Sequence, residues 1–83
     1  MEIAFLHRGR INPLPDAEVE PLSSNAWLIH FTVSERIQRF SRRRARLEDW
    51  DGVTFVIDDQ DTEPAIATAV DGDQVTVTVM VLG

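Results

Sequence analysis

Apolar side chains alternate with polar or small ones in two segments, residues 26–33 and 74–82, and this period of two predicts β-strands. Each strand then has one strongly apolar face, made of Trp27, Ile29, Phe31 and Val33 in one segment and Val75, Val77, Val79 and Val81 in the other. The opposite faces are mildly apolar too, with Leu28 and Met80 among them. A sheet with one face in water has a more polar outer face. We therefore expect the sheet to close into a barrel, or another subunit to cover its second face, or both.

Three more segments have the length and composition of strands, residues 2–8, 52–58 and 65–70. The sequence Asp71–Asp73, with its central glycine, predicts a tight hairpin turn, because Asp-Gly tolerates the positive φ values of such turns. Residues 9–25 contain three prolines, which fix φ and remove hydrogen-bond donors, so we expect an extended loop or an edge segment there. A connection of this length in a small domain is usually functional, disordered or docked on something.

Residues 34–47 have the pattern of an amphipathic helix. Thr32 and Glu35 fit a capping box, with Ser34 as an alternative N-cap, and Gly52 supplies the stop signal. Positions at 100° intervals give the helix an apolar stripe that should dock on the sheet, formed by Val33, Ile37, Phe40 and Leu47.

Arg44 falls inside this apolar stripe, and an unpaired buried charge is costly. Arg44 therefore extends past the edge of the stripe, pairs with a carboxylate, or follows a helix that ends or bends before it.

The resulting order, β-β-α-β-β-β, predicts one α+β domain over residues 1–83. Its core is a small, mainly antiparallel sheet or barrel, and one amphipathic basic helix packs on that sheet.

Charge is distributed unevenly along the chain. Its net charge is −6, with a pI of about 4.6, yet residues 34–47 carry a net +5 and the remainder carries −11. In the predicted helix an i, i+3, i+4, i+7 spacing forms a guanidinium stripe from Arg39, Arg42, Arg43 and Arg46. Guanidinium groups bind carboxylates and phosphates bidentately. The stripe therefore either contacts an acidic surface or is a solvated helix face stabilised by nearby carboxylates.

The short loop 58–63 concentrates acidic residues and is a plausible counterpart for the stripe. Such a dipolar molecule favours head-to-tail association through charge complementarity. We expect the partner to be a protein or a second copy, as in a structural component of a larger complex or virus particle. The predicted contact residues are Arg39, Arg42, Arg43, Arg44, Arg46, Asp58, Asp59, Asp61 and Glu63. The alternative is a small nucleic-acid-binding regulator whose stripe contacts phosphates, which the acidic pI disfavours.

Other chemistries have little support in the sequence. The chain has no cysteine, lysine or tyrosine, and no motif of an activated nucleophile or phosphate loop, so we expect no enzyme and no cofactor. His7 and His30 lie on strands that could be neighbours, but no spacing supplies a third metal ligand. The acidic loop lacks the glycine and the terminal glutamate of a calcium loop. No signal peptide or membrane span is expected, which places the protein in the cytoplasm or in a particle assembled there.

Overall fold

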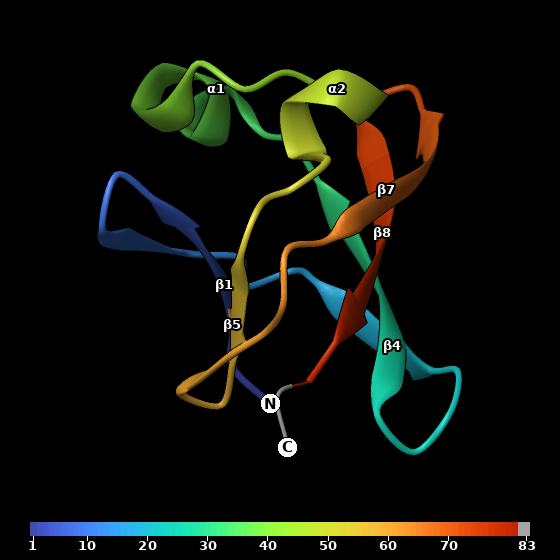
Figure 1. Ribbon diagram of the computed structural model, residues 1–83. Helices are drawn as coiled ribbons and strands as arrows, with labels where there is room; N and C mark the ends of the chain where they lie inside the picture. Colours follow the sequence, from blue (N-terminus) through green and yellow to red (C-terminus); the bar gives the residue numbers. More distant parts are fainter. Residues whose placement is uncertain (82–83) are drawn as a thin grey trace.

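In a computed structural model that describes residues 1–81, the chain forms two four-stranded antiparallel sheets and two short helices (Figure 1). The sheets have the strand orders β2-β1-β5-β6 and β3-β4-β8-β7. The elements are β1 (Ile3–His7), β2 (Arg10–Pro13), β3 (Glu18–Pro21), β4 (Ala26–Thr32), α1 (Glu35–Ser41), α2 (Leu47–Trp50), β5 (Phe55–Ile57), β6 (Gln60–Asp61), β7 (Ile66–Asp71) and β8 (Gln74–Met80). The coarse prediction of a small, mainly antiparallel α+β fold is confirmed. The prediction of a single helix and of the order β-β-α-β-β-β is not confirmed, because four strands precede two short helices.

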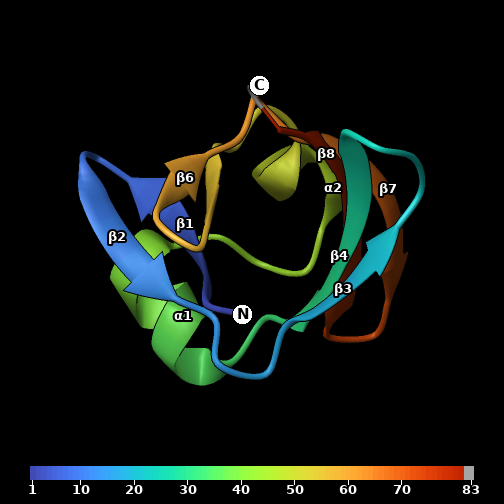
Figure 2. The same ribbon diagram turned by 90° about the horizontal axis from the view of Figure 1, so that it is seen from below.

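The core lies between the inner faces of the two sheets, and Figure 2 shows strands surrounding this interior with α2 at its far end. The predicted alternation is confirmed, since the buried residues include Ile29, Phe31, Val33, Val75, Val77 and Val79. Trp50 of α2 joins the sheets. Its ring packs edge-on against Phe5 of β1 and Phe31 of β4, with centroids 4.9 and 4.7 Å away. The first sheet, rather than a long helix, therefore covers the inner face of the second.

Two-residue turns connect three of the hairpins. The predicted turn between β7 and β8 is confirmed, and Gly72 takes the required positive φ of 63°. The β1–β2 turn consists of Arg8 and Gly9, with φ values of 52° and 76°. Positive φ at both central positions matches the right-handed twist of the flanking strands. The predicted 9–25 loop thus contains β2 and β3, which are edge strands, and the edge-segment interpretation of this region is confirmed.

The outer face of the second sheet stays partly exposed in residues 1–81. Leu28, His30 and Thr78 are half-buried there, and Met80 is exposed. One bridge, Thr62 to Val81, joins the two sheets at one end. The expectation that closure would bury the second face is wrong, because closure buries inner faces only. The last residue of the predicted 74–82 strand, Leu82, lies outside the described residues. Within the described part of the chain, no helix is long and apolar enough to cross a membrane.

Candidate interaction site

Helix α1 is much shorter than the 34–47 helix predicted from the sequence. Ser34 caps its start by accepting a hydrogen bond from the Ile37 N–H at 3.3 Å, so Ser34 and not Thr32 is the N-cap. At the other end Arg42 adopts a left-handed conformation, with φ 58° and ψ 14°. A left-handed residue ends an α-helix because the chain leaves the helical path there. The predicted continuation of this helix is therefore wrong.

The residues beyond α1 fold back onto α2. The Asp49 carboxylate accepts hydrogen bonds from the Arg44 N–H at 2.9 Å and from Arg46 Nε at 3.1 Å. The Trp50 indole donates to the Arg44 carbonyl at 2.8 Å. The Arg43 guanidinium donates to the Asp49 carbonyl at 2.8 Å and lies 5.9 Å from the Trp50 ring centroid. These contacts satisfy polar groups that a continued helix would have paired, and they fix the arginine-rich link against α2.

Asp49 is the anion that organises this link. Burial raises the pKa of Asp49, but hydrogen bonds from Arg44 and Arg46, with the positive charges of Arg46 and Arg43, outweigh burial and lower it below its ordinary value. The carboxylate is therefore charged at neutral pH and holds the arginines around it.

The predicted stripe of four arginines does not form one helix face. Its spacing requires a continuous helix, and of the four only Arg39 lies within α1. Phe40 and Leu47, predicted to dock on the sheet, are 39% and 46% exposed. For Arg44 the third alternative is confirmed, because the helix ends before it and the residue is exposed.

The arginines nevertheless gather at one end of the molecule. The β1–β2 turn lies beside α1 in Figure 1, and the rings of His7 and Phe40 meet edge-on with centroids 5.5 Å apart. Burial, followed by the positive charges of Arg43 and Arg8, lowers the pKa of His7. Arg10 also belongs to this hairpin. We call this region the basic end, and it comprises Arg8, Arg10, Arg36, Arg39, Arg42, Arg43, Arg44 and Arg46 with His7 and Phe40.

Internal contacts occupy part of the basic end. Arg36 donates to the Asn12 side chain and the Pro13 carbonyl, both at 3.1 Å. The Arg39–Glu35 pair spans 3.8 Å between strongly exposed side chains, so it contributes little. Within residues 1–81, four arginine side chains take part in neither a salt bridge nor a side-chain hydrogen bond, and these are Arg8, Arg10, Arg42 and Arg44. They remain available to an external anion.

The predicted acidic residues lie at the opposite end of β1. Asp58 and Asp59 form the turn between β5 and β6, and this turn is tied to the first strand by two hydrogen bonds. The Asp58 N–H donates to the Glu2 carbonyl at 2.9 Å, and the Glu2 N–H donates to the Asp58 carboxylate at 2.8 Å. We call this region the acidic end, and its exposed members are Glu2, Asp58, Asp59, Asp61 and Glu63.

The two ends are separated by the length of β1. Six residue steps from Glu2 to Arg8 correspond to roughly 20 Å of extended strand. The arginine salt bridges found in residues 1–81 use Glu35, Glu48 and Asp49, and none uses the acidic end. The arginines and the 58–63 carboxylates therefore do not pair within one molecule. Their pairing between two molecules stays a prediction.

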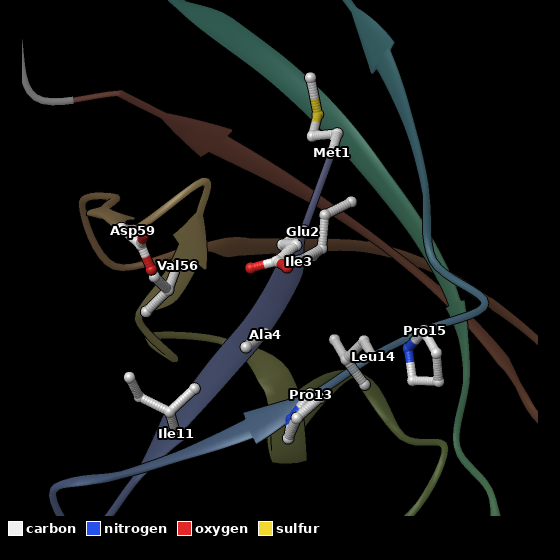
Figure 3. Close-up of a pocket in the computed structure, with 10 residues that line it drawn as sticks. All are labelled: Met1, Glu2, Ile3, Ala4, Ile11, Pro13, Leu14, Pro15, Val56 and Asp59. Carbon is white, nitrogen blue, oxygen red and sulfur yellow. The ribbon is translucent and has the colours of Figure 1, made fainter.

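An apolar groove of about 440 Å³ adjoins the acidic end (Figure 3). Ala4 of β1 lies between Val56 of β5 and Ile11 of β2, and Ile11 is 61% exposed. The side chains of Glu2 and Asp59 also line the groove, so apolar surface and negative charge occur together. Concave apolar surface edged by charged groups is a common feature of protein contact sites.

The histidines do not form a metal pair, because β1 and β4 belong to different sheets. His30 instead contacts the Thr76 hydroxyl at 2.9 Å and the Glu20 carboxylate at 3.3 Å on the outer face of the second sheet. Across the described residues, no group of three or more histidine, aspartate or glutamate side chains is placed to hold a metal ion.

Sequence reasoning missed the contribution of the β1–β2 hairpin to the basic end. Arg8 and Arg10 were separated from the helix by the predicted loop, and Phe40 was assigned to the core. The signal was Gly9, since a glycine directly after a strand, followed by an apolar position at Ile11, is compatible with a two-residue turn. Glu2 was likewise not singled out, because its proximity to Asp58 depends on the pairing of β1 with β5.

No protein-family model, curated protein or solved structure matches this chain.

Proposed function

We propose that this protein is a non-enzymatic interaction subunit of a larger assembly, either homo- or hetero-oligomeric. A structural component of a complex or virus particle, in the cytoplasm or assembled there, is an example of this class. One observation carries the proposal, namely the separation of the basic end from the acidic end on one small domain. Complementary potentials of this kind steer encounter and fix the orientation of partners.

Carboxylates are the better match for the basic end. Fourteen acidic residues against eight arginines give the chain a net charge of −6, and this field opposes the approach of a nucleic-acid backbone. A protein surface offers isolated carboxylates and apolar side chains together. Exposed Phe40 and Leu47 beside the arginines favour such a mixed surface.

A second function, binding of single-stranded nucleic acid, is favoured by one feature of the same region. Phe40 is exposed and follows Arg39 in α1, and an aromatic ring close to an arginine is a platform on which a base stacks. The regulator of this alternative would use Arg8, Arg10 and Arg42 on phosphates.

Recovery of partners from nuclease-treated lysate separates the two functions. The bait is the untagged protein, and it is compared with a variant carrying Arg8→Glu and Arg10→Glu in the exposed hairpin. We expect a protein partner, or additional copies of the chain, to be retained by the wild type and lost from the variant. The matched control reverses two exposed acids instead, Asp71→Arg and Asp73→Arg. A parallel recovery uses lysate that has not been treated with nuclease. If the wild type retains nucleic acid there and no protein in either lysate, the proposal is overturned in favour of the alternative.

A further inference from the structure

We infer that the groove beside the acidic end is the docking site for the basic end of a second copy of this chain, with Phe40 as the apolar contact. This inference rests on the proposed function and names the partner and the contact geometry. The argument depends on three features of the described residues: the content of the groove, the content of the basic end, and their positions.

The groove offers apolar surface together with negative charge. Ala4, Val56 and Ile11 provide the apolar part, and Glu2 and Asp59 the carboxylates. Its volume of about 440 Å³ lies in the range of pockets that receive a small ligand, so an aromatic side chain has room there. These carboxylates are exposed rather than convergent and buried, and this favours a protein side chain over a small molecule.

The basic end presents the complementary pair of properties. Phe40 is exposed on α1, with Arg39 beside it in the helix and Arg42 directly after the helix. Phenylalanine and arginine are both enriched in the cores of protein interfaces, and arginine is also enriched among the residues that contribute most to binding. Apolar contact and charge complementarity are therefore both available from one helix entering one groove.

Phe40 packs against His7 at the last residue of β1, whereas Glu2 and Asp59 lie at the other end of that strand, and Phe40 is not among the residues that line the groove. One molecule therefore does not place its own Phe40 in its own groove. A contact between different surfaces of identical chains is heterologous, and it leaves one free surface of each kind on every dimer. Such contacts continue into rings or filaments.

The test uses two variants, each defective in one surface. The basic-end variant carries Arg39→Glu and Phe40→Ser, and the groove variant carries Glu2→Arg and Ile11→Arg. The matched control for the groove variant is Ile66→Arg with Asp71→Arg, because Ile66 is 64% exposed on β7, outside the groove. Leu22→Ser is the control for the loss of exposed apolar surface at Phe40, because Leu22 is 53% exposed and lies outside both surfaces. Circular dichroism and thermal unfolding establish that all four variants fold.

Light scattering coupled to size exclusion gives the mass of each species. We expect wild type and both controls to associate, and each defective variant to be a 9.4 kDa monomer whose association is weakened about tenfold or more. An equimolar mixture of the two defective variants should give a species of twice that mass and nothing larger. Each such dimer contains one intact contact, and its remaining surfaces are defective.

Two results would overturn the inference. The first is a monomeric mixture under conditions in which the wild type associates, because self-association would then use another surface. The second is a wild type that stays monomeric up to millimolar concentration, a result that needs no variant to fold. If the basic end still retains a protein partner from lysate in that case, the docking of a second copy is wrong and the proposed function stands.

Discussion

At the scale of single residues, Trp50 determines where the arginine-rich segment goes. Its ring is fully buried between Phe5 and Phe31, while its indole N–H reaches the carbonyl of Arg44. One side chain therefore fills the core and also holds the link between the helices. The indole N–H belongs to a fully buried side chain, and a buried donor without an acceptor carries a desolvation penalty, so this hydrogen bond ties the Arg44 carbonyl to the core.

Replacing Trp50→Phe should lower the free energy of unfolding by about 1–3 kcal/mol, because it removes the hydrogen bond and leaves a cavity. Urea denaturation followed by circular dichroism measures the loss. The control is Trp27→Phe, at the half-buried tryptophan, which should cost clearly less. Equal losses of unfolding free energy in the two variants would contradict the claim that Trp50 stabilises the core more than the half-buried Trp27 does.

Asp49 makes stability depend on acid pH. Its folded-state pKa lies below the value of about 3.9 expected in the unfolded chain, so its contribution is complete above that value. The contribution is lost as the pH falls through the folded pKa, because the unfolded state then binds the proton more readily. Asp49→Asn should cost about 1–2 kcal/mol at neutral pH, since hydrogen bonds to a charged acceptor are lost.

The gap between the wild type and Asp49→Asn should narrow as the pH is lowered from neutrality to about 2. Chemical denaturation at several pH values measures this gap, with Asp71→Asn as an exposed control. A gap that stays constant over the whole range would show that the charge of Asp49 does not hold the link.

At the scale of elements, the short helix α1 decides how the charge is displayed. Because it ends at Ser41, Arg42 and the arginines after it do not share one helix face with Arg39. Arg42 has the left-handed conformation that glycine adopts without a steric cost. The helix end therefore contains a strained residue that also belongs to the basic end.

Arg42→Gly should raise the free energy of unfolding by about 0.5–1 kcal/mol, because glycine removes the strain at the helix C-cap. Arg42→Ala keeps the Cβ atom and should give no gain. Thermal and urea unfolding of both variants provide the measurement. Had the helix continued to residue 47 as its periodicity predicts, Gly would instead destabilise it by about 1 kcal/mol relative to Ala.

The strands were more predictable than the helix for a physical reason. Alternation along β4 and β8 follows directly from burial of one face, and the inner residues were assigned correctly. The end of α1 depends on Trp50 and Asp49, which lie later in the chain and act through tertiary contacts. Local propensity favours a longer helix, and these contacts override it. β2 and β3 were obscured by their prolines, which are compatible with edge strands as well as with loops.

The site was predictable only in part for the same reason. Separation of charge along the chain predicted the acidic turn and most of the arginines. The places of Glu2 in the acidic end and of Arg8 in the basic end depend on strand pairing. The start of β1 lies beside the acidic turn, and the end of β1 lies beside α1. The groove depends on three strands at once, which no local pattern reveals.

At the scale of the whole molecule, the fold converts a sequence of mixed charge into a small body with unlike ends. The acidic end includes an apolar groove, and the basic end includes exposed Phe40. Each end by itself is an ordinary charged surface. In the head-to-tail assembly that we propose, the basic end of one copy meets the acidic end of the next, and salt would weaken this contact.

Sedimentation equilibrium of the nuclease-treated wild-type protein, at increasing concentration and at two salt concentrations, tests this assembly most directly. We predict an average mass that rises above 9.4 kDa with concentration and falls again when salt screens the charges. A mass of 9.4 kDa at every concentration and both salt concentrations would contradict self-assembly.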